Sequence, residues 1–530
     1  MRWRAPLSAS TGEPAESRAG GFLGGNPALH KGIETMVLST SQMQALERRA
    51  FESGASAEAL MEEAGRQIAD VVRDFFPQPG RCSVFFGKGH NGGDALVAAR
   101  HLSRAGWRLE LSPAFAPETW SPLTRRKYEE LPAAAPVRAG DAADVGSAEV
   151  VLDGLLGIGA SGPLREPVLA AVRSLQTRRL ERNAVVFSLD LPTGLDGDTG
   201  AADPEAVRAD FTLTIGFAKS GLLADGAAAF VGRLAVLPLD ALTAAASTQE
   251  GVSVAVPREL ARLLPRRGFD LHKGDCGRVT VVAGAPGMLG AAWMCAEACV
   301  RSGAGLVTLM VSREIYPLVA WAACPEVMVQ PTHSYLEALD VRSDVMAIGP
   351  GLGLARRPQI LELISRVPCP MVVDADALNA LSSQPAILEN RAGPRLLTPH
   401  PGEMARLDPE SPGRDRLRTL ELFTERCSHT LLLKGARTLV GQRGKAPSFN
   451  STGSPGMASG GMGDVLTGVC AGLAAQGLPL YDAARLGAWL CGRAAELAIF
   501  RGPHSEESLS ATAVLGHLGA AFKALRAGRW

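Results

Sequence analysis

The sequence carries no net charge, few aromatic residues and no long apolar run. Its 530 residues include 54 Lys and Arg against 54 Asp and Glu, which gives no general electrostatic attraction to nucleic acid or to an anionic membrane. No segment approaches the roughly 18 apolar residues that a membrane span requires, and the N-terminus lacks an apolar signal-peptide core. We therefore expect a cytoplasmic protein that binds neither nucleic acid nor membrane.

The cysteines lack the spacing of a metal site or of a disulfide framework. There are nine, an odd number, and eight of them lie from Cys276 onward without any C-x-x-C pair. Cys295 and Cys299 are four residues apart and could share a metal, but no His pair lies near them. The prediction is therefore reduced thiols that are mostly packed in the core.

The remaining composition is that of a globular chain. Hydrophobic residues make up 46 % and charged residues 20 %, which is enough apolar surface to offset the entropy of ordering the chain. The 59 glycines indicate many tight turns. The length allows three or four average domains or two large α/β domains.

The pattern along the chain favours two domains. Residues 1–35 are rich in Gly, Pro, Ser and Arg without apolar periodicity, so we expect them to be disordered. Ser41 is expected to begin a first helix, and 56–76 to form a second. The strand signal disappears after residue 240. The expected divisions are a first domain at 36–240, a linker at 241–254 and a second domain at 255–530.

Short apolar runs that end in glycine-rich turns alternate with helical stretches, as in parallel βαβ units. The fold class predicted is therefore α/β, with two doubly wound domains, the first a Rossmann-like three-layer domain. The expected strands are 82–86, 150–154, 184–190, 211–217, 278–284, 304–311, 345–351, 370–376, 395–400 and 430–435.

In the first half, oxygen-bearing side chains follow three expected strands. Ligands of open parallel sheets bind beyond the carboxyl ends of the strands, so these positions are informative. Asn91, Asp153 and Thr193 offer amide, carboxylate and hydroxyl oxygens that suit a hard cation. A single Asp at a strand end is more often a cap, but here three such ends occur together.

The motifs HNGGDA (90–95), DGLLGIGASGP (153–163) and DLPTGLDGDTG (190–200) together resemble the epimerase domain of bifunctional NAD(P)H-hydrate repair proteins, over about residues 40–235. The resemblance implies that Asp190 is catalytic and that Asn91, Asp153 and Thr193 hold K⁺. Two positions depart from the family pattern: His90 replaces Asn and Ala95 replaces Gly, which puts the shape of the first loop in doubt. The substrate contacts implied are His90, Asn91, Gly92, Gly93, Asp94, Gly157, Ile158, Gly159, Ala160, Ser161, Gly162, Pro163 and Asp190.

In the second half, a glycine-rich stretch at 450–464 leads directly into an apolar helix at 465–475. Backbone N–H groups at such a helix N-terminus bind phosphate, and Asp464 would lie beside it as a base for a substrate hydroxyl. The alternative for Asp464 alone is a helix cap. The turn resembles the Gly-x-Gly-Asp turn of ribokinase-like folds.

Five further motifs follow in the order of the ADP-dependent NAD(P)H-hydrate dehydratase domain, which the sequence resembles over about 255–525. They are HKGDCGR (272–278), AGAPGMLGA (283–291), GPGLG (349–353), TPHPGE (398–403) and KGART (434–438). The implied contacts to the hydrate are Ala291, Gly353, His400 and Asp464, and those to the nucleotide are Lys434, Gly435, Ala436, Arg437, Thr438 and Gly463. His400 alone would be read as structural.

The resemblance thus implies a bifunctional isomerase and lyase that repairs hydrated NADH and NADPH (NADHX and NADPHX). The first domain would epimerise the R and S hydrates, and the second would dehydrate the S epimer at the expense of ADP, giving NAD(P)H, AMP and phosphate. Mg²⁺ would accompany the nucleotide, and a homo-oligomer is expected. Two alternatives stay open: a ribokinase-like small-molecule kinase, and a first half that only binds a partner.

Overall fold

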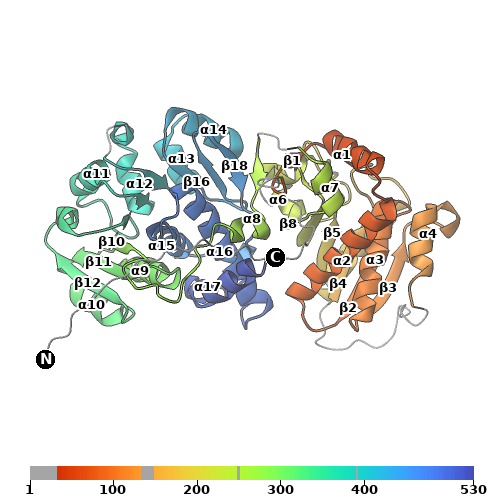
Figure 1. Ribbon diagram of the computed structural model, residues 1–530, viewed down its shortest axis with the longest axis horizontal. Coiled ribbons are helices and arrows are strands. Elements are labelled where there is room, and N and C mark those ends of the chain that lie inside the picture. The colour runs from red at the N-terminus through yellow and green to blue at the C-terminus, as the bar shows by residue number, and fades with distance from the viewer. Residues whose placement is uncertain (1–32, 133–148, 161, 248–250, 390–391) are drawn as a thin grey trace, which may run out of the picture.

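The computed structural model describes residues 33–132, 149–160, 162–247, 251–389 and 392–530. Two α/β domains lie side by side along the long axis of the molecule, the N-terminal one built on a six-stranded sheet and the C-terminal one on a ten-stranded sheet (Figure 1). Among the described residues, no helix combines the length and the apolar character that crossing a membrane requires.

All strands of the six-stranded sheet are parallel, in the order β3-β2-β4-β5-β6-β8. Consecutive parallel strands require crossovers, and helices supply most of them. The strands are β2 Arg81–Phe86, β3 Arg108–Pro113, β4 Glu149–Gly154, β5 Val185–Leu189, β6 Phe211–Ile215 and β8 Arg233–Leu237. The longer helices are α1 Thr40–Glu52, α2 Ala57–Phe75, α3 His90–Arg104, α4 Pro122–Glu129 and α5 Val168–Arg182.

The ten-stranded sheet is parallel from β12 through β11, β10, β13, β14 and β15 to β16, and continues through the antiparallel β17 and β18 to β9. Its strands are β9 Ser253–Val254, β10 Arg278–Val282, β11 Leu306–Ser312, β12 Val327–Thr332, β13 Val345–Ile348, β14 Met371–Val373, β15 Arg395–Leu397, β16 Thr430–Leu433, β17 Leu439–Gln442 and β18 Lys445–Phe449. Its helices include α8 Pro257–Ala261, α9 Leu289–Arg301, α10 Tyr316–Ala322, α11 Arg357–Arg366, α12 Ala375–Leu381, α13 Pro401–Leu407, α14 Arg416–Arg426, α15 Met462–Ala475, α16 Leu480–Phe500 and α17 Ala511–Arg526.

The predicted fold class is confirmed, because each of the ten expected apolar runs contains a strand. The sequence did not predict β3 and β8, at the two edges of the smaller sheet, nor β12, β9 and the antiparallel pair β17 and β18 in the larger one. The first helix begins earlier than expected, because Ser39 and not Ser41 caps it by accepting from the Gln42 N–H.

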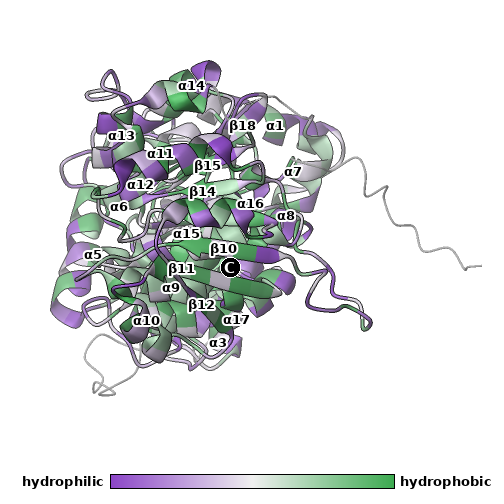
Figure 2. Ribbon diagram, turned by 90° about the vertical axis from the view of Figure 1, so that its left-hand side faces the viewer, coloured by the Kyte–Doolittle hydropathy of each residue, from purple (hydrophilic) through white to green (hydrophobic). Residues whose placement is uncertain are grey.

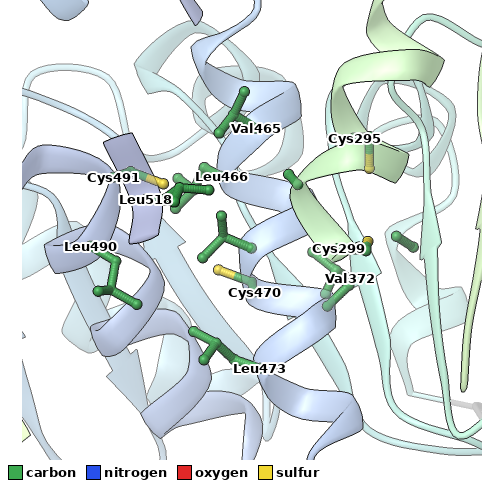
Figure 3. Close-up of a cluster of buried hydrophobic side chains, with 14 of the residues drawn as sticks. Cys295, Cys299, Val372, Val465, Leu466, Cys470, Leu473, Leu490, Cys491 and Leu518 are labelled. Carbon is green, nitrogen blue, oxygen red and sulfur yellow. The ribbon is translucent and has the colours of Figure 1, made fainter. Parts of the chain in front are cut away.

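The core of the C-terminal domain lies between its sheet and the helices α9, α15 and α16. Cys295, Cys299, Cys470 and Cys491 lie there among aliphatic side chains (Figure 3). All nine cysteines are free thiols and six of them are buried, as expected. In Figure 2 the strands β10 and β11 are predominantly hydrophobic along their length, as strands covered on both faces must be.

Segments near both ends of the N-terminal domain connect it to its neighbour. Ile33 and Thr35 are buried, so ordered structure begins before Met36, whereas residues 1–32 of the expected disordered segment lie outside the described part. Thr35 accepts a hydrogen bond from the Val254 N–H at 2.8 Å. Within the expected linker, α7 Asp240–Ala245 is helical, and β9 joins the larger sheet.

A network of charged side chains crosses the contact between the domains. From the N-terminal domain, Asp74 accepts hydrogen bonds from Arg493 at 2.5 Å and Arg501 at 2.6 Å. Arg233 donates from Nε to Glu496 Oε1 at 3.0 Å, and Arg493 donates to Glu496 Oε2 at 3.1 Å. The side chains of Arg493 and Glu496 are each only 1 % exposed, so these charges depend on one another for solvation.

We expect Glu496→Gln to lower the free energy of unfolding by about 3–5 kcal/mol, because it leaves the buried Arg233 guanidinium without its ion-pair partner and Arg493 with Asp74 alone. Urea unfolding followed by circular dichroism measures this change. The control is Glu362→Gln, which breaks an exposed pair with Arg366 on α11 and should cost less than about 1 kcal/mol. Equal losses in both variants would contradict a specific role for the network.

Candidate active sites

The first candidate site lies at the carboxyl ends of β2, β4 and β5. These strands are adjacent and parallel, so the segments that follow them meet at one edge of the sheet. The turn at 87–89 is tight: a side chain on Gly92 would meet the Gly87 carbonyl oxygen at 2.2 Å. His90 starts α3, so the residues of the first predicted loop form the first turn of a helix.

Ala95, one of the two departures from the family pattern, is accommodated by a neighbouring glycine. Its side chain is fully buried, and a Cβ on Gly154 would lie 2.6 Å from the Ala95 Cβ. The extra methyl group therefore fills space that Gly154 leaves open, and α3 still approaches the end of β4.

The three residues predicted to bind a cation lie in one hydrogen-bond network. Thr193 donates to Asp153 through its hydroxyl at 2.7 Å and its N–H at 3.0 Å. Asn91 donates to the Leu156 carbonyl oxygen at 2.8 Å, and the Leu156 N–H donates to Thr193 Oγ1 at 3.2 Å. Burial raises the pKa of Asp153, whereas the hydrogen bonds from Thr193 and Ser188 lower it.

The donor set of this network fits a monovalent cation. Asn91 Oδ1 is buried and has no hydrogen-bond partner, so it is an acceptor available to a ligand. The single carboxylate of Asp153 is fully buried, together with the Thr193 hydroxyl. In the described part of the chain, no three His, Cys, Asp or Glu side chains form a cluster that would suit a more highly charged ion.

Asp190 is held rigidly beside this network. It adopts a left-handed backbone conformation with φ of 65°, which is unusual for a residue other than glycine. Its carboxylate accepts from the Ile158 N–H at 3.4 Å and forms a short ion pair with the buried Lys219. Gly157 adjoins both sides of the site, because its Cβ would lie 3.4 Å from Asp190 Oδ2 and 3.5 Å from Asn91 Cβ.

Two more carboxyl groups lie close enough to Asp190 to interact with it electrostatically. Burial raises the pKa of Asp94 well above its usual value, and the negative charges of Asp190 and Glu47 raise it further. The pKa of Glu47 is raised by burial and by Asp190. These surroundings favour the protonated form of the Asp94 carboxyl group, whereas the Asp190 carboxylate has Lys219 as an ion-pair partner.

A cavity of about 700 Å³ adjoins this site, between the segments that follow β4 and β5. It is large enough for a small-molecule ligand. Ser161 lies outside the described residues, and His90, Asn91, Asp94 and Asp190 do not line the cavity. The predicted residues that line it are Gly157, Ala160, Gly162, Pro163 and Thr193.

The second candidate site lies at the carboxyl ends of β13 to β16 and is centred on Asp374. This buried carboxylate accepts from Lys434 Nζ at 2.7 Å and from Thr398 and Thr467, both at 2.8 Å. Burial lowers the pKa of Lys434, but Asp374 outweighs it, so the pKa rises overall. Gly463 adjoins the pair, because its Cβ would lie 3.2 Å from Lys434 Nζ.

Asp464 lies at the first turn of α15, next to this ion pair. The helix begins after Gly461, which has a φ of 87° that favours glycine. Burial, followed by the charge of Asp374, raises the pKa of Asp464 to about 6. Its carboxylate is therefore ionised at neutral pH but basic enough to accept a proton.

The other predicted hydrate contacts are Ala291, Gly353 and His400. The Gly353 N–H donates to Asp376 Oδ2 at 2.8 Å, and Ala291 on α9 packs where Gly351 has no side chain. His400 accepts the Gly402 N–H at 3.0 Å through Nδ1, so it caps α13, while its side chain remains 52 % exposed. The cap orients the ring and leaves its outer edge accessible.

The predicted nucleotide turn at 434–438 has side chains that contact two different parts of the molecule. Lys434 binds Asp374, and Gly435 and Ala436 are exposed. The Arg437 guanidinium does not point to this site, because it donates to two carbonyl oxygens of the N-terminal domain. Thr438 donates to the Gly435 carbonyl oxygen at 3.5 Å, which closes the turn.

Sequence reasoning missed Lys219, Glu47, Asp374 and Asp376. Asp374 and Asp376 follow an expected strand and meet the criterion applied to Asp153, so their positions could have identified them. Lys219, on the short strand β7 Ala218–Lys219, also lies two residues after an expected strand, 211–217. Glu47 lies on helix α1 without such a signal, and only the packing of α1 brings it near Asp190.

Comparison with known proteins assigns a family to each half. The family described as YjeF-related protein N-terminus matches residues 57–221, and the family described as NAD(P)H-hydrate dehydratase matches residues 279–510. Together these matches span both candidate sites.

Relatives with both halves match most of the chain. A bifunctional NAD(P)H-hydrate repair enzyme of Moorella thermoacetica is 38 % identical, covering 82 % of this chain and 87 % of the relative. One from Coxiella burnetii is 35 % identical, covering 91 % and 99 %. Among solved structures, an ADP/ATP-dependent NAD(P)H-hydrate dehydratase of Bacillus subtilis, co-crystallised with ATP and Mg²⁺, is 27 % identical with a TM-score of 0.44, covering 53 % of this chain and all of that one.

We expect Asp464→Asn to stabilise the fold at neutral pH. The folded-state pKa near 6 exceeds the usual aspartate value of 3.8, so the stability contributed by Asp464 is complete below pH 3.8 and is lost as the pH rises through about 6. Asparagine avoids that loss, and the gain should reach roughly 2 kcal/mol at pH 8.

Urea unfolding at pH 4 and at pH 8 measures the difference, which should nearly vanish at the lower pH. The matched control is Asp70→Asn, at an exposed position on α2, which should change little at either pH. A variant that is no more stable than the original protein at pH 8 would show that the carboxylate is not destabilised by its surroundings.

Proposed function

The chain belongs to the family of bifunctional NAD(P)H-hydrate repair enzymes, and from this premise we propose that it restores hydrated NADH and NADPH in two steps. The domain at 36–240 interconverts the R and S hydrates, and the domain at 255–530 dehydrates the S epimer with ADP. The observation that carries the proposal is the presence, in one chain, of two strand-end sites that each hold a buried carboxylate paired with a lysine.

In the epimerase site, Asp190 assists departure and return of the hydroxyl group. The ring nitrogen stabilises the iminium that forms when the hydroxyl leaves as water, and water adds back to the opposite face. Lys219 orients the Asp190 carboxylate and balances its charge, and Asp94, whose pKa is raised by burial, is a candidate source for the proton that the leaving hydroxyl takes up. One water is lost and one is added back, so the step consumes no other reactant.

In the dehydratase site, Asp464 accepts the proton of the substrate hydroxyl as its oxygen attacks the terminal phosphorus of ADP. AMP leaves, and the phosphate ester is then lost as phosphate while the ring gives up a proton and regains its double bond. The backbone N–H groups at the start of α15 and the Lys434 ammonium lie where charge on the moving phosphoryl group needs stabilising.

Asn91, Asp153 and Thr193 are the residues that would hold K⁺ in the epimerase site. The unpartnered Asn91 oxygen supports this assignment. When bound, the cation would balance the buried charge and fix the segment that carries Gly157. Mg²⁺ would come with the nucleotide, because among the described residues no cluster of three His, Cys, Asp or Glu side chains is available to bind it.

The remaining proposals concern the setting of the enzyme. The nine free thiols support a location in the reducing cytoplasm. We also propose a homo-oligomer whose partners are small molecules, namely NADHX, NADPHX and ADP. The kinase alternative would give a stable phosphorylated product and not free phosphate, so analysis of the products distinguishes it.

The two activities should separate by substitution. Asp190→Asn should slow epimer interconversion at least tenfold, the minimum expected from losing a proton-transfer group, and Asp464→Asn should abolish ADP-dependent restoration while interconversion continues. Chromatography resolves the epimers, and absorbance of the reduced ring follows restoration. Loss of both activities in either variant would argue against two independent sites.

The epimerase should depend on K⁺. Replacing K⁺ with tetramethylammonium, which is too large for an enclosed oxygen site, should slow interconversion by roughly tenfold and lower the melting temperature, because a ligand that binds only the folded state stabilises it. Thr193→Val removes one candidate ligand and should lose both responses. Identical rates and melting temperatures in the two salts would refute the cation site.

A further inference from the structure

The nucleotide turn at 434–438 connects the two domains. Lys434, at its first position, binds Asp374 of the dehydratase site. Arg437, three residues later, donates through its two terminal nitrogens to the carbonyl oxygens of Leu222 at 2.7 Å and Gly232 at 3.1 Å, both in the epimerase domain. One short turn is therefore fixed at one end by the dehydratase site and at the other by the neighbouring domain.

Arg437 is an unusual residue for a contact between domains. Its side chain is only 4 % exposed, and it forms no ion pair with the described carboxylates. Burial, together with the charge of Arg416, lowers its pKa to about 10. A buried guanidinium is costly unless its acceptors are placed accurately, so the two carbonyl oxygens define its position closely.

A second arginine holds the same turn through its backbone. Arg416, the first residue of α14, donates from Nη1 to the Arg437 carbonyl oxygen at 2.9 Å and from Nε to Asp225 of the epimerase domain at 2.7 Å. A Cβ on Gly435 would lie 2.1 Å from Arg416 Nη1, so Arg416 reaches the turn because this residue is glycine. The turn is thus held through both the side chain and the backbone of Arg437.

The acceptors on the epimerase side belong to well-ordered structure. Leu222 lies in the short helix η2 Ser220–Leu223, which directly follows Lys219, the partner of Asp190. Gly232 precedes β8 and has a φ of 57°, and any side chain there would collide with the Asp210 carbonyl oxygen at 2.4 Å. Neither carbonyl group can move without disturbing the epimerase domain.

We propose that Arg437 is a positioning residue through which the epimerase domain fixes the nucleotide turn of the dehydratase domain. The inference rests on the proposed function, in which residues 434–438 bind ADP. Holding the turn in its bound conformation before ADP arrives removes the entropic cost of ordering it. The epimerase domain then contributes to ADP affinity without touching the nucleotide.

The test measures KM and kcat for ADP in the full-length enzyme, and Kd for ADP by calorimetry. Arg437→Met keeps the apolar length of the side chain but removes both donors, and should raise KM and Kd about tenfold, the size expected from losing a charge-assisted hydrogen bond, with a smaller effect on kcat. Arg437→Lys keeps one donor and the charge, and should recover part of the affinity.

The matched control is Arg501→Met. Arg501 also connects the two domains, because it binds Asp74, but it is distant in sequence from the turn at 434–438. In this variant Asp74 retains its hydrogen bond from Arg493. The KM of the Arg501→Met variant for ADP should be unchanged. The proposal is overturned by an unchanged KM in Arg437→Met, or by equal increases in Arg437→Met and Arg501→Met.

If Arg437→Met does not fold, as judged by circular dichroism, Asp225→Asn decides the question. Asp225 belongs to the epimerase domain and binds Arg416, which holds the turn, so a roughly threefold increase in KM for ADP supports the proposal and an unchanged KM overturns it. An enzyme that binds ADP in an Arg437-dependent way but restores no reduced dinucleotide would refute the proposed function and retain this inference. Absence of ADP binding would overturn both.

Discussion

The ion pair between Lys434 and Asp374 organises the dehydratase site. Asp374 is buried at the end of β14, where it joins Lys434 from β16, Thr398 from β15 and Thr467 from α15. A buried carboxylate without such partners would be very unfavourable, so the four segments must come together for the domain to fold. The same pair sets the electrostatic surroundings of Asp464, because its negative partner raises the pKa of Asp464 and its positive partner lowers it. The packing of these segments and the electrostatic surroundings of the proposed base therefore depend on the same ion pair.

The epimerase site repeats this arrangement with different residues. Lys219 and Asp190 form a buried pair at the end of a parallel sheet, and the neighbouring Asp94 has a strongly raised pKa. In both sites a lysine pairs with one carboxylate, and a second carboxyl group nearby has a raised pKa. The epimerase site adds the oxygen network of Asn91, Asp153 and Thr193, in which Asn91 Oδ1 has no hydrogen-bond partner.

The sequence predicted the central strands and the residues that directly follow them. Strands buried on both faces read as continuous apolar runs, so the sheet centre was recognisable. Edge strands such as β3 and β12 carry polar or exposed residues and gave no comparable signal. The residues after strands, including Asp153 and Thr193, are adjacent because parallel strands end together. Glu47 could not be predicted in this way, because it lies on α1 and only tertiary packing brings it near Asp190. For Arg437 the motif predicted a nucleotide contact, whereas its side chain binds two carbonyl oxygens of the other domain, which the local sequence does not show.

The charged contact between the domains restricts how the gene could be divided into two. Separating the chain near residue 250 would expose Asp74 and Arg233 on one product and Arg493 and Glu496 on the other, together with the aromatic rings of Phe75 and Phe500, which lie 5.3 Å apart. Each product would then expose a surface of apolar and unpaired charged groups that is prone to non-specific association. Fission of this gene into two independent enzymes would therefore require compensating substitutions on both halves, whereas the fused chain keeps their stoichiometry at one to one.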